Sequence, residues 1–307
     1  MRVVEKINSV LEKLMRKNKD LYLVGEDIID PYGGAFKVTK GLSTKFKNRV
    51  LTTPISEPSI IGFSAGLALS KKKVVAEIMF GDFLPLTFDQ IINHISKFIW
   101  VYNNIDIPLI IRTPMGGGRG YGSTHSQSLE KHFCGVSDIN VIAINQYTDF
   151  DKLYETALKS KQPTIIIENK ILYGKQIQNQ NIFKNNPDII CVTYGGSVEV
   201  CVKSAVSLLE SEEIIVEVYP VENLSPFNYN EVSKLSKKCK KFLFVEEANL
   251  GWGFNDMCKA SIAGIDGVKF SEINGPSHPI PSTKKWEVNL MPNINRITDA
   301  LKELFNK

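Results

Sequence analysis

The regular alternation of apolar runs with helix-patterned segments constrains the fold of this chain more than any other feature. Short apolar runs with the length of buried strands lie at residues 21–24, 50–53, 74–78, 108–112, 140–144 and 164–168. Segments with apolar residues at helical spacing, at residues 3–17, 60–69 and 88–102, lie between them. Strands that alternate with helices in this way predict an α/β fold with doubly wound, mainly parallel sheets.

The alternation stops and starts again near the middle of the chain. Residues 176–188 are rich in Asn and Gln and poor in apolar side chains, which is the composition of a linker. Beyond them, strand-like runs at 189–193, 214–219, 241–246 and 268–272 alternate with helical segments at 198–209, 229–237 and 253–262. At 307 residues the chain is long enough for two domains, and we expect them at residues 1–180 and 188–307.

Composition and charge exclude several classes of function. The chain has 37 Lys and Arg against 33 Asp and Glu, a net charge of +4, which is too mild to indicate nucleic-acid binding. No run reaches the ~18 apolar residues of a membrane helix. Five cysteines without a C-x-x-C pair argue against a disulfide framework and a zinc knuckle. We therefore expect a cytoplasmic protein.

A glycine-rich loop follows the strand predicted at residues 108–112 and leads to a histidine. Its sequence, Gly116-Gly117-Gly118-Arg119-Gly120-Tyr121-Gly122, fits neither G-x-G-x-x-G nor the P-loop spacing. This favours a flexible loop over a nucleotide site. His125 stands among Ser and Thr on this loop, where an imidazole can change its charge near neutral pH and exchange a proton with a substrate. A structural histidine is the alternative.

Glu57 lies just beyond a strand end and ahead of the nearly uncharged helix predicted at residues 60–69. At a helix N-terminus a carboxylate can simply favour the helix dipole, by ~0.3 to 1 kcal/mol. If its apolar neighbours bury it, the protonated form is favoured and the group becomes a usable proton carrier.

Six short motifs follow one another in the first half of the chain. They are Gly25-Glu26-Asp27, Tyr32-Gly33-Gly34-Ala35-Phe36-Lys37, Thr53-Pro54-Ile55-Ser56-Glu57, Phe88-Asp89-Gln90-Ile91, Arg112-Thr113-Pro114 and His125-Ser126-Gln127-Ser128. In order and spacing the chain resembles the beta subunit of the decarboxylating component of 2-oxo-acid dehydrogenase complexes, which uses thiamine diphosphate. The resemblance covers nearly the whole chain, including Glu246-Glu247-Ala248. It implies a pyrimidine-binding transketolase-like domain followed by a transketolase C-terminal-like domain.

The resemblance implies roles for five residues. Glu57 would hydrogen-bond a ring nitrogen of the cofactor's aminopyrimidine, and Phe83 would stack on that ring, with Met79 on the same strand-end loop. Glu26 would link two cofactor sites through a proton path. His125 would protonate or stabilise carbonyl-derived intermediates and guide the acceptor, a lipoyl group. For Phe83 and Met79 core packing is the alternative, and for Glu26 an exposed loop carboxylate.

The signature that holds Mg²⁺ and the diphosphate in thiamine enzymes, Gly-Asp-Gly followed by Asn-Asn, is not matched. Gly81-Asp82-Phe83 and Asn103-Asn104 come nearest, but the gap of nineteen residues is too short and Phe83 replaces the second glycine. We therefore expect an alpha subunit to bring the metal-binding half, in an α₂β₂ heterotetramer. A lipoyl acyltransferase would be a further partner. A potassium site around residues 157–162 is also usual in the family.

The substrate and the acceptor stay open. His94 and Arg119 are unusual beside the pyruvate and branched-chain enzymes. We expect His94 to be structural, whereas Arg119 is either a carboxylate- or phosphate-binding residue or a solvated loop residue. Two other functions remain: a split transketolase-like subunit that transfers a ketol or acyl fragment to a sugar or aldehyde, and a catalytically silent scaffold subunit.

Overall fold

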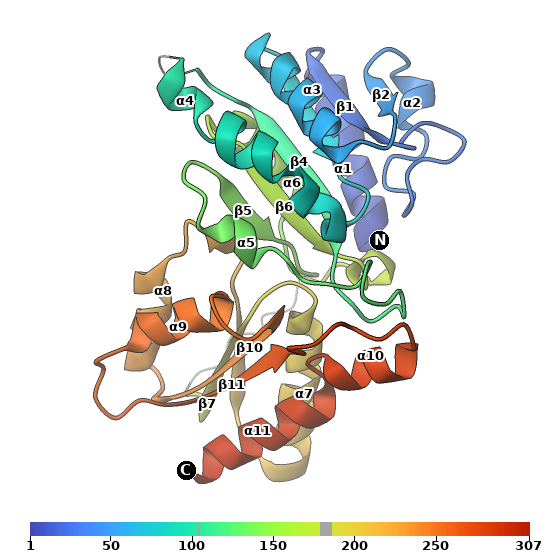
Figure 1. Cartoon of the computed structure of the whole chain (residues 1–307). Helices are drawn as coiled ribbons and strands as arrows, with labels where there is room; N and C mark the ends of the chain where they lie inside the picture. Colours follow the sequence, from blue (N-terminus) through green and yellow to red (C-terminus); the bar gives the residue numbers. More distant parts are fainter. Residues whose placement is uncertain (103–104, 179–185) are drawn as a thin grey trace.

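The computed structural model describes residues 1–102, 105–178 and 186–307, and it shows two sheets with helices around them (Figure 1). The first sheet has seven strands in the order β2-β1-β3-β4-β6-β5-β9, and the second has four in the order β11-β10-β7-β8. Neighbouring strands are parallel except for β5 and β9. The predicted fold class, two doubly wound and mainly parallel sheets, is confirmed.

The strands lie close to the predicted apolar runs. They are β1 (Leu21–Glu26), β2 (Val50–Thr53), β3 (Lys73–Glu77), β4 (Leu109–Met115), β5 (Asn140–Ala143), β6 (Thr164–Asn169), β7 (Ile189–Thr193), β8 (Val216–Pro220), β9 (Asn223–Ser225), β10 (Lys241–Asn249) and β11 (Lys269–Gly275). The central strands β4 and β6 are buried along their whole length. Burial on both faces explains why their sequences are almost continuously apolar.

Helices cover both faces of each sheet. The α-helices are α1 (Val3–Lys17), α2 (Leu42–Lys45), α3 (Glu57–Leu69), α4 (Phe98–Val101), α5 (Lys131–Cys134), α6 (Phe150–Lys159), α7 (Ser197–Glu212), α8 (Tyr229–Lys234), α9 (Phe254–Ile262), α10 (Lys284–Leu290) and α11 (Ile294–Asn306). Shorter 3₁₀ turns are η1 (Gly81–Thr87), η3 (Leu172–Gly174) and η4 (Leu235–Lys237), and η2 (Asp89–Ile95) is a π-helix. Within the three described ranges, no helix is both long enough and apolar enough to cross a membrane.

Residues 88–102 do not form the single amphipathic helix that the sequence predicts. They divide into η2 and α4, because η2 is wound more widely than an α-helix: the Ser96 N–H bonds the Ile91 carbonyl, five residues back, at 3.1 Å. Such π-turns interrupt the 3.6-residue period on which the prediction rests. His94 is exposed on this turn.

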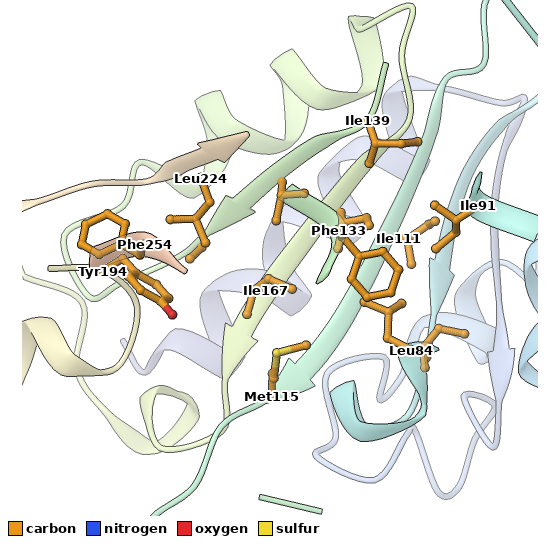
Figure 2. Packing of buried hydrophobic residues seen from close by; sticks show 14 of the residues in the cluster. Leu84, Ile91, Ile111, Met115, Phe133, Ile139, Ile167, Tyr194, Leu224 and Phe254 are labelled. Carbon is orange, nitrogen blue, oxygen red and sulfur yellow. The ribbon is translucent and has the colours of Figure 1, made fainter. Parts of the chain in front are cut away.

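One apolar cluster runs from the first sheet into the second half of the chain (Figure 2). It joins Ile167 of β6 to Tyr194, Leu224 and Phe254, and the Tyr194 and Phe254 ring centroids are 4.8 Å apart. β9, which the sequence does not predict, also belongs to the second half, yet it extends the first sheet by pairing antiparallel with β5. The predicted linker at 176–188 lies partly outside the described residues. The two sheets therefore share a core.

Candidate functional site

Glu57 and Glu26 lie close together at the carboxyl edge of the first sheet. β1 ends at Glu26, whose register partner Thr53 is the last residue of β2, and α3 begins at Glu57 with Pro58 in its first turn. Burial raises the pKa of Glu26, and the charges of Asp27 and Glu57 raise it further. The fold thus brings two of the predicted residues within electrostatic reach of each other.

The Glu57 side chain is largely buried, but its carboxylate oxygens keep contact with the surface. The residue is 6% exposed, and no donor among residues 1–102, 105–178 and 186–307 hydrogen-bonds to its carboxylate. A carboxylate without a protein donor at the carboxyl edge of a parallel sheet is a candidate for binding a ligand.

A fully bonded ion cluster lies behind this edge. Arg112 of β4 is 1% exposed and pairs with Glu77 of β3 and Glu168 of β6. Tyr154 and Tyr173 donate to Glu168 at 2.7 and 2.6 Å. Burial raises the pKa of Glu77, Arg112 opposes that change, and Glu168 and Glu26 add to it. The sequence showed Arg112 only as part of a motif, although a charged residue ending an apolar strand was a signal for such a cluster.

His125 packs edge-on against two phenylalanine rings. Its ring centroid is 4.7 Å from that of Phe80 and 5.3 Å from that of Phe83, with interplanar angles of 87° and 81°. Its Nδ1 lies 2.9 Å from Thr124 Oγ1. Met79 is half-buried, directly before Phe80. Phe83 lies on η1, which packs against α3, so the aromatic group and Glu57 belong to neighbouring elements.

The glycine-rich loop that carries His125 is held from the second half of the chain. The Gly117 N–H donates to Glu247 of β10, and the Gly120 N–H donates to Glu287 of α10. A Cβ on Gly117 would lie 2.7 Å from the terminal carbon of Met291, so a side chain there would have to displace that methyl group. Sequence analysis predicted a flexible loop. The structure instead shows a loop fixed by two carboxylates that lie far away in the sequence.

Lys170, at the end of β6, is the third anchor of this loop. Its Nζ donates to the His125 carbonyl at 2.8 Å, and the residue is fully buried. Burial lowers its pKa to about 8, although Asp82, Glu247 and Glu287 act in the opposite direction. Sequence analysis missed Lys170, because only its position in the folded chain distinguishes it from the other lysines.

A second group of buried acids lies where the two sheets meet. Burial raises the pKa of Glu130 to about 7 and that of Glu246 to about 8, and the Glu130 charge contributes to the shift at Glu246. Tyr194 donates to one Glu130 oxygen, and the other oxygen has no partner in the described chain. Glu130 and Glu247 also line a cavity of about 10 Å³, the size of one water molecule. Nothing in the local sequence around Glu130 indicates this role.

In the nearest match to a metal-binding signature, one Asp82 oxygen makes a structural contact and the other is buried without a partner in the described chain. One Asp82 oxygen accepts from the Gln127 N–H and from its side-chain amide, both at 3.1 Å, and Asn103-Asn104 lies outside the described residues. Elsewhere in the described ranges, no group of three or more His, Cys, Asp and Glu residues could hold a metal ion. His94 Nε2 is 3.6 Å from Asp89 on the same helical turn and does not join the site.

The segment predicted to bind potassium has one hydrogen bond within it and one to Asp138. The Ala157 carbonyl accepts from the Ser160 N–H at 3.2 Å. The Gln162 side-chain amide donates to Asp138 at 2.7 Å. The potassium site stays a prediction.

Helix α3 is apolar on its outer face as well as its inner one. Ile60, Ile61, Ala65 and Ala68 are buried, whereas Phe63 is 50% exposed between Gly62 and Gly66. Ile55, just before the helix, and Leu86, on η1, are also exposed. A helix that is hydrophobic all round is typical of a buried element. The sequence indicated this face only through the lack of charge at residues 60–69.

The chain matches two protein families along its length. Residues 1–176 match the family "Transketolase, pyrimidine binding domain", and residues 179–297 match "Transketolase, C-terminal domain". A solved structure, "Split gene transketolase, inactive beta4 tetramer", superposes with a TM-score of 0.78 over 98% of this chain and 97% of that one, at 16% identity. At that identity the superposition supports the fold alone.

Several curated proteins are similar over nearly their full length. The chain is 30% identical to the "Pyruvate dehydrogenase E1 component subunit beta" of Chlorokybus atmophyticus, over 92% of this chain and 89% of the relative. It is 28% identical to the "Acetoin:2,6-dichlorophenolindophenol oxidoreductase subunit beta" of Cupriavidus necator, over 97% and 95%. It is 29% identical to the "2-oxoisovalerate dehydrogenase subunit beta 2, mitochondrial" of Arabidopsis thaliana, over 100% and 89%.

Proposed function

We propose that this chain is the beta subunit of a thiamine-diphosphate-dependent 2-oxo-acid dehydrogenase. The chain belongs to the transketolase-like family that includes the beta subunits of pyruvate dehydrogenase E1. The reaction is oxidative decarboxylation of a 2-oxo acid with transfer of the acyl group to lipoamide. The proposal rests on the buried Glu57 carboxyl group, which no donor in the described chain satisfies.

The residues fit the pyrimidine half of such a cofactor. A buried carboxylic acid can donate a proton to a ring nitrogen. At this edge of the sheet, the Glu57 carboxyl group has no hydrogen-bond donor in the described chain. Phe83 offers an aromatic surface for a flat ring, and the half-buried Met79 lies on the same strand-end segment. Glu26, with its raised pKa, can exchange protons with Glu57 through bound water.

Thiamine diphosphate supplies the carbon nucleophile and the electron sink that decarboxylation requires. The work of this chain is to hold and move protons. Glu57 holds a proton against the pyrimidine ring. His125 keeps its Nδ1 on Thr124, which leaves Nε2 to donate to or accept from the substrate oxygen and the acceptor. Phe80 and Phe83 keep the imidazole oriented.

A separate alpha subunit completes the site in this proposal. The diphosphate and Mg²⁺ need hard oxygen ligands, and Asp82, the nearest candidate here, is bonded to Gln127. The exposed apolar face at Ile55, Phe63 and Leu86, next to Glu57 and η1, is the surface that we assign to the alpha subunit. Two copies of each chain would form an α₂β₂ heterotetramer, and a lipoyl acyltransferase would dock on it.

Two finer features belong to the proposal. The location is cytoplasmic, as the cysteine pattern predicts. A potassium ion at residues 157–162 is the expected structural cation, and a Tm that rises with KCl but not with NaCl would support it.

Reconstitution tests this proposal. The chain alone should bind thiamine diphosphate with Mg²⁺ weakly, and the pair co-expressed with its alpha subunit should bind it tightly, as measured by titration calorimetry. The pair should then decarboxylate one of a panel of 2-oxo acids in the presence of an artificial electron acceptor. Tight binding of the cofactor by the chain alone would contradict the divided site.

A split transketolase-like transferase is the alternative. It would use the same Glu57 and cofactor, but it would transfer a ketol or acyl fragment to an aldehyde or sugar. Turnover that requires an aldehyde acceptor and gives no electron transfer would favour this alternative. The names of the similar curated proteins favour the dehydrogenase.

A further inference from the structure

A large cleft lies between the two halves of the chain, and the site described above does not use it. Its volume is about 960 Å³, which is in the range of small-molecule sites. One wall is the glycine-rich loop at Gly117, Gly118 and Arg119, and the opposite walls come from the first turns of α7 and α11 and from the end of α10. Glu57, Phe83 and His125 are not among its lining residues.

Positive charge dominates the lining of this inter-domain cleft. Its basic residues are Arg119, Lys175, Lys203, Lys284 and Arg296, and its acidic residues are Glu199 and Glu247. Five cations against two carboxylates leave an excess of three positive charges. A cleft with an excess of one sign of charge concentrates ions of the opposite sign.

Both carboxylates of the cleft are already engaged. Glu199 pairs with Lys175 and Lys203 at 2.9 and 2.7 Å. Glu247 accepts from the Gly117 N–H and from the Asn169 amide. These acids therefore do not neutralise the remaining three cations.

Those three cations, Arg119, Lys284 and Arg296, have no carboxylate within ion-pair distance in the part of the chain that the structure describes. Arg119 is held in place by a 2.8 Å bond to the Lys170 carbonyl and lies over the Phe36 ring. Arg296 donates to the Leu290 and Asn274 carbonyls at 2.6 and 3.0 Å. Two guanidinium groups are thus fixed in advance, which lowers the entropy cost of binding.

The three residues come from different elements, namely the glycine-rich loop, α10 and α11, and all three line the same cleft. The first turns of α7 and α11 line the same space and add a modest positive potential to it. Arginine forks and helix N-termini are both typical partners of phosphate oxygens.

We propose that the inter-domain cleft binds a small diphosphate-bearing anion, such as inorganic pyrophosphate or a nucleoside diphosphate, at Arg119, Lys284 and Arg296. The glycine-rich loop that forms one wall leads to His125 and is held by Glu247 and Glu287. A bound anion therefore lies against the loop that positions the histidine. This inference does not depend on the cofactor or on the proposed reaction.

Titration calorimetry of the full chain with inorganic pyrophosphate, without Mg²⁺ or thiamine diphosphate, tests the site. Lys284→Ala should weaken binding about tenfold, the effect of losing one charge-assisted hydrogen bond. Lys285→Ala removes the neighbouring lysine on the same helix, which does not line the cleft, and should change the affinity less than twofold. Hydrogen exchange at residues 117–121 should slow when pyrophosphate is present.

Two further arms identify the ligand and separate this cleft from the cofactor site. ADP that binds more tightly than pyrophosphate would identify a nucleotide, and equal affinities would identify any diphosphate group. Glu57→Gln should leave pyrophosphate binding unchanged, because Glu57 is not in the cleft. The proposal is wrong if the wild-type chain does not bind pyrophosphate, or if Lys284→Ala and Lys285→Ala weaken binding equally.

Discussion

Two buried glutamates near the carboxyl edge of the first sheet have opposite surroundings. Glu168 is fully buried and accepts hydrogen bonds from Arg112, Tyr154 and Tyr173. Glu57 is 6% exposed and has no such donor in the described chain. A buried charge with a full set of donors is committed to one arrangement of the core, whereas a carboxylate without protein donors is left for solvent or a ligand. Burial alone therefore does not distinguish structural from functional acids, but the set of hydrogen-bond donors does.

The largest effect is expected from Glu57→Gln. In the reconstituted pair it should lower turnover by about 10² to 10⁴, the usual contribution of a positioned proton carrier, while leaving the free energy of unfolding nearly unchanged. Steady-state decarboxylation and chemical denaturation measure the two quantities. Glu210→Gln, at an exposed position, is the matched control. Full turnover in Glu57→Gln would instead favour a scaffold subunit.

The fully bonded cluster should show the reverse pattern. Arg112→Met leaves Glu77 and Glu168 buried without their cation, and this should lower the free energy of unfolding by about 3–5 kcal/mol. Arg16→Met breaks an exposed pair with Glu12 and should cost at most about 1 kcal/mol. Urea denaturation followed by circular dichroism compares them. Equal losses would remove the distinction between the two glutamates.

The anchors of the His125 loop should affect activity more than stability. Lys170→Met removes the bond to the His125 carbonyl, so kcat should fall about tenfold, the worth of one charge-assisted hydrogen bond. Hydrogen exchange at residues 116–128 should become faster. Lys170→Arg keeps the charge and should recover part of kcat. An unchanged exchange rate in Lys170→Met would show that Glu247 and Glu287 hold the loop without it.

The smallest effect is on the pH dependence of stability. The pKa of Glu246 is raised from 4.5 to about 8 by burial, so the folded chain keeps a proton that the unfolded chain loses. Unfolding then releases protons, and stability is lost as the pH rises from 4.5 to about 8. Glu246→Gln should flatten the fall in the free energy of unfolding between pH 6 and 8, by about 1–2 kcal/mol. A slope that matches the wild type would place this pKa outside that range.

Much of the fold could be predicted from local patterns. The strands follow apolar runs, and Glu57 could be selected because an apolar segment follows it directly. The elements that the sequence did not predict either depend on contacts between distant residues or interrupt the helical period. η2 interrupts the helical spacing at Ser96, and β9 is only three residues long and is defined by its pairing with β5.

The site was predictable only where sequence neighbours define it. Glu57, Glu26, Phe83 and His125 stand in motifs, whereas Lys170 and Glu287 act on the His125 loop across 45 and 167 residues of sequence. The local sequence does not distinguish a lysine at a strand end or a glutamate in a short helix from other residues of the same type. Glu130 is missed for the same reason, because its shifted pKa comes from burial between the two sheets.

The strand β9 has a consequence for dividing this molecule. β9 adds three residues of the second half to the outer edge of the first sheet. A fragment that stops before β9 would leave β5 as an exposed edge strand, which is prone to aggregation. Two separately expressed halves should therefore be insoluble apart and recover as a non-covalent pair when mixed. The boundary suggested by the family matches is thus a place to cut the gene, but because of β9 we expect the two halves to depend on each other for folding.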